Sequence, residues 1–393
     1  MRYYLIAGEA SGDLHGSNLM KGLYAKDPQA RMRFWGGGLM KAVWQEHEPA
    51  DTEGGLVVDY KDGAVMGFWE VLMKARSLTQ KIERCKADIL AWKPDVVILI
   101  DYPGFNFKMA EFAHGKGLKV FYYIAPKVWA SREGRIKKLK AYVDKLFIVF
   151  PFEEEYFRRK GVPYIYRGNP LIDAIDGSDA LKETRPEFLA KAGLPEDARF
   201  VALLAGSRGN ELSFMMPRLV EMADRMHALP QYENWHFILA GAPSRTIADY
   251  DRYIGERPWI RVVFNETYAV LRHAEAAVIK SGTASLEGVL IGTPQVVGYG
   301  SNSNITYLIG RQIIRVKYIS LGNLIIDRCA FRELLQQYCT ADSLLTEVRR
   351  LIEDEAYRAR MKADYAEIRE RLGGSGASAA VATAMIEELN QKN

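Results

Sequence analysis

The chain has 393 residues, of which 48% are hydrophobic and 26% are charged, and its formal net charge is +4. This length exceeds what one hydrophobic core usually supports, so we expect two α/β domains, and the ordinary composition excludes disordered and fibrous proteins. The charge is too small to indicate a nucleic-acid partner, although it is compatible with an anionic membrane surface or a phosphorylated ligand.

Cysteine usage and the first residues both indicate a cytoplasmic protein. Cys85, Cys329 and Cys339 have neither metal-binding nor redox spacing, which favours reduced thiols. The apolar stretch within residues 1–7 is too short for a signal peptide. No apolar run reaches the roughly 18 residues of a membrane-spanning helix.

Short apolar runs alternate along the chain with segments of helical periodicity, which is typical of parallel βαβ units. In the first half the predicted strands are Tyr3–Ala7, Arg33–Trp35, Val96–Ile100, Leu118–Ile124 and Leu146–Phe150. In the second half they are Phe200–Leu204, His236–Ala240, Val262–Phe264, Ala276–Ile279 and Gln295–Val297. After about residue 342 the pattern is helical, with a break at Gly373–Gly376.

These patterns predict an α/β fold of the GT-B type, in which two Rossmann-like domains are followed by a C-terminal helical segment. The expected N-terminal domain covers residues 1–172 and the expected C-terminal domain covers residues 173–344. We expect the helices from about 345 to 393 to pack back on the N-terminal domain or on a partner subunit. Because fold alone does not fix function, the loops must supply it.

The first glycine-rich loop, residues 8–16, follows the first predicted strand. Glycines there let a ligand approach the backbone, and the next helix offers amides to an anion. The loop is not a G-x-G-x-x-G, and Glu9, Asp13 and His15 suit sugar hydroxyls better than a pyrophosphate. The alternative is a strand-to-helix turn in which Asp13 is a helix cap, and the loop by itself leaves both interpretations open.

Asp101 follows the apolar run Val96–Ile100, at the end of a strand where ligands bind in open α/β sheets. A partly desolvated carboxylate there could act as a general base toward an acceptor hydroxyl. The alternative is that Asp101 bonds nearby loop amides. Pro103 and Gly104 make the turn without its help, which favours the catalytic interpretation.

Two further segments of the first half have competing explanations. Residues 64–72 are unusually apolar, which indicates core packing by default and, as the sharper hypothesis, a patch that faces an acylated acceptor or a membrane. After the loop 126–130, a basic segment runs from Arg132 to Lys140. Such a segment is commonly a solvated helix face, and its functional interpretation is attraction to acidic lipid head groups or to a substrate phosphate.

Two loops of the second half each offer a helix N-terminus to phosphate. Residues 205–211 combine glycines with Arg208, which suits a departing diphosphate because negative charge grows on it in the transition state. Residues 280–288 add a second helix start, in which Glu287 would bind ribose hydroxyls. Each loop alone could be an ordinary turn, with a surface arginine in one and Ser281 as cap in the other. Together on one sheet edge they favour a nucleotide diphosphate.

Signatures of metals and cofactors are missing from the sequence. It has no Walker A motif, no H-E-x-x-H, no nucleophile elbow and no cysteine–histidine metal set. We therefore expect neither a metal nor a cofactor, and we expect amides and an arginine to stabilise the leaving group.

Seven motifs follow one another along the chain: Gly8–Asp13, Val65–Gly67 with Glu70–Leu72, Asp101–Asn106, Pro126–Ala130, Gly206–Gly209, Ser281–Glu287 and Tyr318–Leu324. In this order they closely resemble the motifs of the lipid-A-disaccharide synthase family. Any one of them is weak, but the ordered set covers nearly the whole chain and is highly specific.

The resemblance implies an inverting glycosyltransferase that works without a metal. It implies that UDP-2,3-diacylglucosamine is joined to 2,3-diacylglucosamine 1-phosphate through a β-1,6 bond, with release of UDP, in lipid A and lipopolysaccharide biosynthesis. Since both substrates carry acyl chains, it implies a peripheral protein on the cytoplasmic face of the inner membrane. Some family members form homodimers by exchanging C-terminal helices, which the break at Gly373–Gly376 permits here.

The resemblance also implies roles for individual residues. Asp101 and Glu9 are the expected catalytic residues: Asp101 would be the base for the acceptor 6-hydroxyl, and Glu9 would lie in the acceptor pocket. Arg208, Glu287 and Asn323 hold the donor nucleotide and its phosphates. The further substrate-binding residues that we expect are Ser11, Asp13, Met66, Ser207, Ser281, Gly282 and Thr283.

Three motifs depart from those of the family. In the Pro-Ser-x-Trp-Ala-Trp motif this chain has Lys127 in place of serine and Ser131 in place of the last tryptophan. Asn169 stands where the family has the histidine of Gly-His-Pro, and Gly322 stands where it has the proline of Ser-Leu-Pro-Asn. These departures bear on acyl-chain preference and on contacts between domains more than on the reaction.

Three other functions stay open. A nucleotide-sugar 2-epimerase shares the fold but needs no acceptor, and the apolar segment 64–72 argues against it. An NAD-dependent oxidoreductase would have a G-x-G-x-x-G with an acidic residue about 20 positions on, and neither half provides one. A non-catalytic nucleotide-binding protein is the third alternative, which acceptor-dependent release of UDP would exclude.

Overall fold

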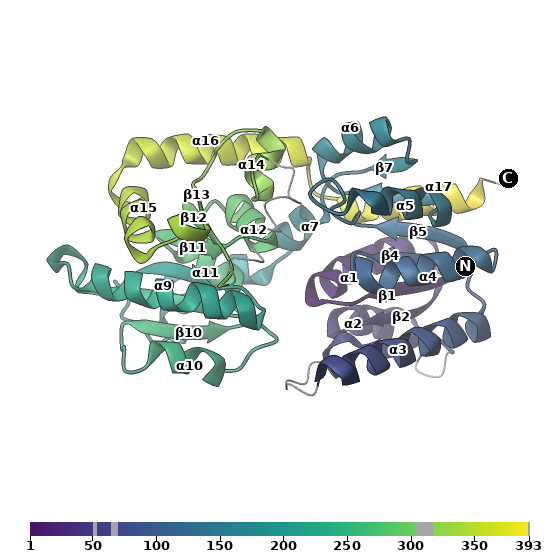
Figure 1. Cartoon of the computed structure of the whole chain (residues 1–393), viewed down its shortest axis with the longest axis horizontal. Coiled ribbons are helices and arrows are strands. Elements are labelled where there is room, and N and C mark those ends of the chain that lie inside the picture. The colour runs from purple at the N-terminus through teal and green to yellow at the C-terminus, as the bar shows by residue number, and fades with distance from the viewer. Residues whose placement is uncertain (50–52, 64–69, 303–316, 392–393) are drawn as a thin grey trace. The chain divides into compact units, whose positions relative to one another are not determined.

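The computed structural model describes residues 1–49, 53–63, 70–302 and 317–391. Two compact units share these residues (Figure 1): unit 1 combines Met1–Ala174 with Gly373–Asn393, and unit 2 is Ile175–Leu372. Each unit is built on one parallel sheet with helices packed against it. The prediction of two Rossmann-like α/β domains is therefore confirmed.

The sheet of unit 1 has the strand order β3-β2-β1-β4-β5-β6-β7, and its described strand pairs are parallel. Its strands are β1 (Arg2–Ala7), β2 (Arg31–Gly36), β3 (Gly55–Asp59), β4 (Val96–Ile100), β5 (Lys119–Tyr123), β6 (Lys145–Ile148) and β7 (Tyr164–Tyr166). Its helices are α1 (Ala10–Lys26), α2 (Gly38–His47), α3 (Glu70–Trp92), α4 (Pro103–Gly115), α5 (Ile136–Tyr142), α6 (Pro151–Lys160) and α17 (Ala377–Asn390). The short helix α7 (Pro170–Asp176) begins in unit 1 and ends in unit 2.

The sheet of unit 2 has the order β10-β9-β8-β11-β12-β13 and is also parallel in its described pairs. Its strands are β8 (Arg199–Leu204), β9 (Trp235–Gly241), β10 (Ile260–Phe264), β11 (Ala276–Lys280), β12 (Gln295–Tyr299) and β13 (Glu333–Leu335). Its helices are α8 (Arg185–Lys191), α9 (Gly209–His227), α10 (Ala248–Ile254), α11 (Thr267–His273), α12 (Thr283–Ile291), α14 (Leu321–Ile326), α15 (Ala341–Glu353) and α16 (Glu355–Leu372).

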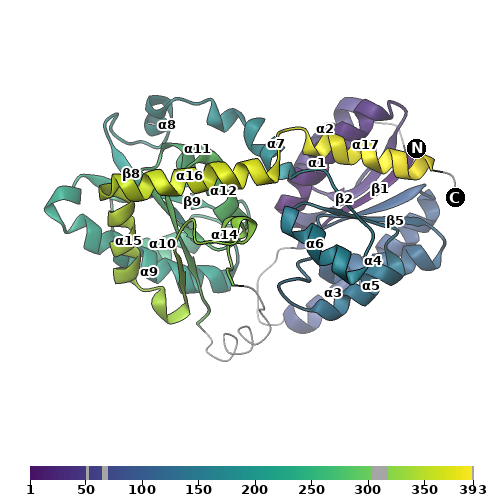
Figure 2. The same cartoon turned by 90° about the horizontal axis from the view of Figure 1, so that it is seen from above.

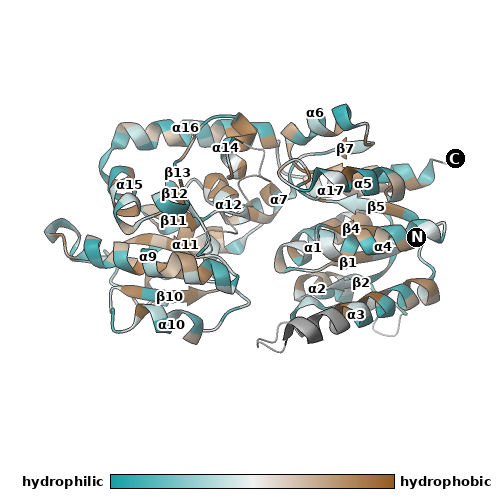
Figure 3. Ribbon diagram, in the orientation of Figure 1, coloured by the Kyte–Doolittle hydropathy of each residue, from teal (hydrophilic) through white to brown (hydrophobic). Residues whose placement is uncertain are grey.

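The central strands are continuous apolar runs because both faces of each sheet are covered. Tyr3 and Tyr4 of β1 point to opposite faces, and both are fully buried. The residues of β4 are buried along its whole length. In Figure 3 the hydrophilic colour dominates α16, whose outer side faces solvent. Within the described residues, no helix combines the length and the apolar composition needed to cross a bilayer.

All ten strands expected from the sequence are present, and the structure adds β3, β7 and β13. These three lie at the edges of their sheets. The residues of β7 are half-buried throughout, and only the middle residue of β13 is fully buried. An edge strand has one neighbour and buries less of its side chains, so it lacks the continuous apolar run from which a central strand is predicted.

The C-terminal helices divide between the units, whereas the sequence predicted that they leave the second domain together from about residue 345. α16 stays with unit 2 because Tyr365 is buried there and donates a hydrogen bond to the carbonyl of Thr293 at 3.2 Å. Only α17 joins unit 1, where it packs along α1 (Figure 2). A β-carbon at Gly22 of α1 would lie 2.8 Å from that of Ala382, so small residues make this close packing possible.

Candidate active site

The two sheets place the predicted loops at equivalent points. In each sheet the chain crosses from one side to the other after its third strand, so that β1 lies beside β4 and β8 beside β11. Ligands of open parallel sheets bind at the carboxyl ends of the strands at this crossing. Glu9 follows β1 and Asp101 follows β4, while Ser207 and Arg208 follow β8 and Ser281 follows β11. Each unit therefore carries one cluster of the predicted residues.

Asp101 and Tyr102 have two successive left-handed backbone conformations, with φ angles of 43° and 47°. Such conformations cost on the order of 1–3 kcal/mol for a non-glycine residue, so the surroundings must impose them. The carbonyl of Asp101 accepts hydrogen bonds from the side chains of Asn106 and Tyr122, each at 2.7 Å. Its N–H donates to the carbonyl of Tyr123 at 3.0 Å. These contacts fix the direction in which the Asp101 side chain leaves the sheet.

Tyr102 lies over the loop that follows β1. A β-carbon at Gly8 would overlap the ring of Tyr102, so the close approach requires glycine at this position. Burial, and then the negative charge of nearby Glu9, raise the pKa of Tyr102. Glu9 itself is exposed just before α1. The structure thus brings the loops of Glu9 and Asp101 together at one edge of the sheet.

Asp13 and Ser11 both lie in the first turn of α1, where Ser11 is half-buried. Asp13 is only 3% exposed, and its carboxylate accepts hydrogen bonds from three backbone N–H groups at the start of α2, at 2.8 to 3.1 Å. It therefore caps α2 and ties the loop after β1 to the loop after β2. The structure thus gives Asp13 a positioning role, and its contact with substrate stays a prediction.

The loop after β5 is anchored by a carboxylate that the sequence did not single out. The indole N–H of Trp129 donates to Glu153 at 2.9 Å, and Glu153 also accepts the N–H groups of Val149 and Phe150. Glu153 is 1% exposed, and burial raises its pKa to about 7. In the sequence it resembles an ordinary acid in the first turn of a helix, and only the fold brings it to Trp129.

The basic segment that follows forms a solvated face of α5. Ile136 and Leu139 are buried within unit 1. The basic residues around them are exposed: Arg132, Lys137, Lys138 and Lys140. The outer side of α5 is therefore basic.

The predicted site residue Met66, with residues 64–69, lies outside the described residues. The role predicted for the apolar segment 64–72 is therefore not tested by the structure.

In unit 2 the loop after β8 is already bonded to a carboxylate of the chain. The N–H groups of Ser207 and Arg208 donate to Glu211 at 3.0 and 3.2 Å, and the Lys280 ammonium donates to it at 2.6 Å. Backbone N–H groups and a cation are the donors expected for a phosphate. In the structure Glu211 accepts these amides, and their contact with a ligand stays a prediction. What the loop presents to solvent is the Arg208 side chain, which is 66% exposed.

The loop after β11 leads into α12 at Thr283. Ser281 is buried, Gly282 is half-buried and Thr283 is exposed. Glu287 lies one turn into the helix, where the hydroxyl of Tyr268 donates a hydrogen bond to it at 3.4 Å. Burial raises the pKa of Glu287 to about 7. A buried acid whose pKa is perturbed in this way, beside a helix start, is a candidate site residue.

Asn323 is fully buried and bonded within unit 2. Its amide group donates to the carbonyl of Phe331 at 3.0 Å and to Glu333 at 2.9 Å. Its oxygen accepts the N–H of Ala330 at 2.8 Å. The amide therefore organises the segment that leads into β13, and its predicted role in donor binding stays a prediction.

Two departures from the family motifs have local explanations. A β-carbon at Gly322 would lie 2.8 Å from the Phe331 ring, so glycine allows this ring to pack against α14. Asn169 is buried, donates to the carbonyl of Val149 at 2.9 Å and accepts the N–H of Leu171 at 2.9 Å. It thereby supports the start of α7. Both positions serve packing and capping within their own units.

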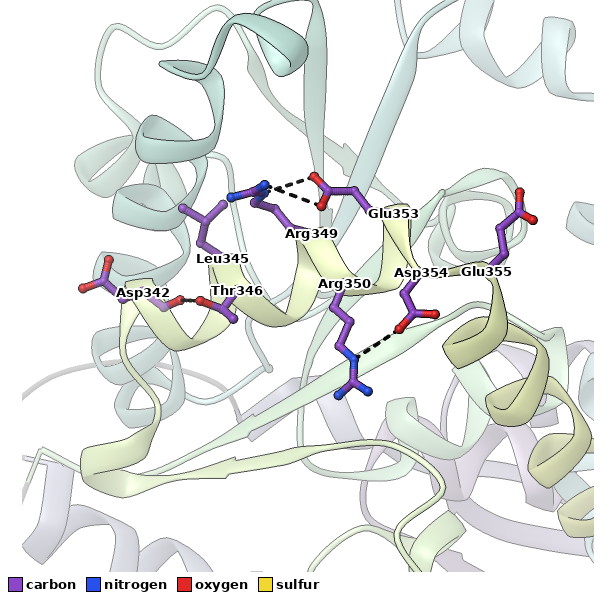
Figure 4. A pocket seen from close by; sticks show the side chains of 8 residues that line it. All are labelled: Asp342, Leu345, Thr346, Arg349, Arg350, Glu353, Asp354 and Glu355. Carbon is purple, nitrogen blue, oxygen red and sulfur yellow. Dashed lines mark hydrogen bonds and ion pairs between the residues drawn. The ribbon is translucent and has the colours of Figure 1, made fainter.

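A shallow concavity on α15 and the start of α16 lies on none of these loops (Figure 4). Its charged side chains pair with one another, Arg349 with Glu353 at 3.1 Å and Arg350 with Asp354 at 3.7 Å. Pairs spaced i,i+4 along a helix stabilise that helix. The concavity is therefore a helix surface, and the candidate site consists of the strand-end loops.

Comparison with known proteins identifies the family to which these loops belong. The family model for lipid-A-disaccharide synthetase matches residues 3–386. A lipid-A-disaccharide synthase of Geobacter metallireducens is 37% identical over 392 residues, which cover 100% of this chain and 98% of that protein. One of Myxococcus xanthus is 35% identical and covers 99% of this chain and 97% of that protein. The chain belongs to the lipid-A-disaccharide synthase family.

Membership confirms the predicted function: the chain is a glycosyltransferase with lipid-A-disaccharide synthase activity in lipid A biosynthesis. Solved structures confirm the GT-B-like fold. A UDP-GlcNAc 2-epimerase from Neisseria meningitidis has a TM-score of 0.70 at 12% identity, covering 98% of this chain and 100% of its own. A calicheamicin glycosyltransferase has a TM-score of 0.57 at 15% identity, covering 99% and 98%. Identities this low show the fold alone, so they do not favour the epimerase alternative.

Proposed function

We propose that this family member transfers the sugar of UDP-2,3-diacylglucosamine to the 6-hydroxyl of 2,3-diacylglucosamine 1-phosphate. The bond from the acceptor oxygen to the anomeric carbon forms as the bond from that carbon to UDP breaks, so the product has an inverted, β-1,6 linkage. The observation that carries the proposal is Asp101, held in a left-handed conformation at the end of β4. Strain of this kind persists where a side chain must be aimed.

In this proposal unit 1 binds the acceptor and removes its proton. Asp101 takes the proton of the 6-hydroxyl as the oxygen attacks, a contribution of about 10²–10⁴-fold for a positioned general base. Glu9 and Ser11, in the loop after β1, bind acceptor hydroxyls. Asp13 contributes by holding that loop against α2. Met66 keeps its proposed role in the acceptor site on the resemblance alone.

Unit 2 binds the donor in the same proposal. Arg208, Ser207 and the start of α12 at Ser281, Gly282 and Thr283 receive the charge that grows on the departing diphosphate. Glu287 accepts hydrogen bonds from the ribose. Asn323 acts through the segment it organises. The scheme assigns leaving-group stabilisation to these groups and uses no metal or cofactor.

The proposal extends to location and assembly. Since both proposed substrates carry acyl chains, the protein works as a peripheral protein on the cytoplasmic face of the inner membrane. The exposed lysines of α5 supply attraction to anionic lipid, worth about 1 kcal/mol for each basic residue near such a surface. A homodimer formed through the C-terminal helices is the proposed assembly, which the glycine break before α17 permits.

Release of UDP tests the reaction directly. The full-length protein is incubated with UDP-2,3-diacylglucosamine, with and without 2,3-diacylglucosamine 1-phosphate, and both UDP and the disaccharide are quantified. We expect UDP to appear only when the acceptor is present, in equal amount to the disaccharide. Acceptor-independent UDP release or an altered free sugar would favour an epimerase and reject the proposal. Asp101→Ala should abolish the acceptor-dependent signal.

A further inference from the structure

A second arginine stands beside the loop that follows β8. Arg245 lies between β9 and α10, and β9 is the neighbour of β8 in the sheet. Its Nε donates a hydrogen bond to the carbonyl of Ser207 at 2.7 Å. One of its terminal nitrogens lies 3.8 Å from the position that a β-carbon would occupy at Gly209, the first residue of α9. The guanidinium therefore reaches the loop that carries Arg208 from the end of the neighbouring strand, β9.

The two arginines differ in how firmly they are held. The side chain of Arg208 is 66% exposed, whereas that of Arg245 is only 10% exposed. Asp249 lies 3.7 Å from Arg245, and Asp249 also accepts the N–H of Thr246 at 3.0 Å. A buried cation needs such partners to offset its lost hydration. A guanidinium with five N–H donors, fixed in one plane, is preorganised for a phosphate group.

The charges around the loop show why a second arginine is needed. Lys280 forms a close ion pair with Glu211, so the charge of each is largely offset by the other. Glu211 also occupies the amides of Ser207 and Arg208. A diphosphate carries more than one negative charge, and the single positive charge of Arg208 would not balance it.

We propose that Arg245 is a second ligand of the donor's diphosphate, already in place before binding, to which the exposed Arg208 adds its charge when the nucleotide arrives. This inference rests on the proposed function, in which unit 2 holds a UDP-linked donor. The Nε bond to Ser207 braces the loop, and the terminal nitrogens near Gly209 meet the phosphate. The sequence gives little sign of it, because Arg245 follows a predicted strand without a glycine motif.

A series of nucleotides with increasing charge tests the proposal. The full-length wild type, Arg245→Gln and Arg245→Lys are titrated calorimetrically with uridine, UMP and UDP. We expect Arg245→Gln to weaken UDP binding by about tenfold or more, in line with the loss of a charge-assisted hydrogen bond. UMP binding should weaken less, and uridine binding should stay the same. Arg245→Lys keeps the charge and should retain more UDP affinity than Arg245→Gln.

Arg252→Ala is the matched control, because Arg252 is exposed on α10 and packs against Tyr253. It should bind all three ligands as the wild type does. Equal weakening of uridine and UDP by Arg245→Gln would mean that Arg245 only braces the loop, and unchanged UDP binding would also overturn the proposal. If the wild type itself fails to bind UDP, the donor site of the proposed function fails instead. Equal UDP affinities of the Gln and Lys variants, with both folded, would reject a role for charge.

Discussion

The two units share one strand order around the crossing point of the sheet, and they carry different side chains there. At the crossing point of its sheet, unit 1 carries the carboxylates Glu9 and Asp101. At the equivalent point, unit 2 carries Arg208 after β8, and Arg245 reaches the same loop from the end of β9. An acidic edge suits removal of a proton from a sugar hydroxyl, and a basic edge suits a diphosphate. The type of fold is therefore the same in the two units, and the residues of their loops differ in charge.

The strand-end loops of the two units also differ in backbone strain. At the crossing point of unit 1, left-handed conformations fall on the non-glycine residues Asp101 and Tyr102. In unit 2 the turn after β8 has its positive φ, 94°, on Gly206, which adopts it without a side-chain clash. A base has to be aimed at one proton, whereas a phosphate accepts donors from several directions. The comparison therefore predicts that unit 1 is sensitive to small changes in geometry and unit 2 to changes in charge.

The largest effect is expected from the acid of unit 1. Asp101→Asn keeps the size of the side chain but removes the base, so turnover should fall by about 10²–10⁴-fold. The affinity for UDP, measured by calorimetry, should stay within about twofold of wild type, because the residues proposed to bind UDP belong to unit 2 and Asp101 belongs to unit 1. Glu111→Gln, an exposed acid on α4, is the control for a lost carboxylate. Comparable losses of turnover and UDP affinity would contradict the assignment of Asp101 as base.

The second effect belongs to the charge of unit 2. Arg208→Ala should weaken UDP binding by about tenfold or more and also slow turnover, because the same charge is proposed to stabilise the leaving group. Arg159→Ala, an exposed arginine of α6, should change neither quantity. Initial rates over a range of donor and acceptor concentrations separate the effects on each substrate. A higher KM for the acceptor, with the donor KM unchanged, would show that the two units have been assigned the wrong way round.

The sequence predicted the central strands and the loops at their ends, because continuous burial leaves an apolar run that is visible in the chain itself. It did not predict which groups those loops bond. Asp101 is held by Tyr122, 21 positions away, and Trp129 by Glu153, 24 positions away. Such contacts depend on how neighbouring strands are aligned in the sheet. The periodicity of a single segment therefore cannot predict them.

The sequence alone did not show whether a loop residue binds a ligand or stabilises the fold. The sequence of the loop at Ser207 is typical of a phosphate site and also of a capped helix start, and in the structure its amides bond to Glu211. Asn323 lies in a family motif and is buried by contacts with the segment before β13. In both cases the same residue types serve ligand binding and folding. Only the partner atoms distinguish the two roles.

The third prediction tests the geometric sensitivity of unit 1. Tyr122→Phe removes the hydroxyl that bonds the Asp101 carbonyl and should lower turnover by several-fold, with little change in KM, because the base is less well aimed. Tyr123→Phe is the matched control, since this neighbouring hydroxyl is buried and does not contact Asp101. Both variants should stay folded, with a loss of about 1–2 kcal/mol for Tyr122→Phe in denaturant unfolding. Equal activity of the two variants would mean that the strain at Asp101 has no catalytic role.

The smallest effect should appear in the pH dependence of donor binding. The pKa of Glu287 in the free protein is raised to about 7 by burial. Hydrogen bonds from ribose hydroxyls favour the ionised carboxylate, so they lower this pKa, and binding becomes stronger as the pH rises through about 7.

Uridine is the probe for this pH dependence, because it has no phosphate to titrate in this range. We expect its affinity to rise a few-fold across this range for the wild type and to be flat for Glu287→Gln. Weaker binding at higher pH would mean that the protonated acid, acting as a donor, is the binding form. A slope retained in Glu287→Gln would assign the dependence to another group, and unit 2 would then recognise its nucleotide by phosphate charge alone.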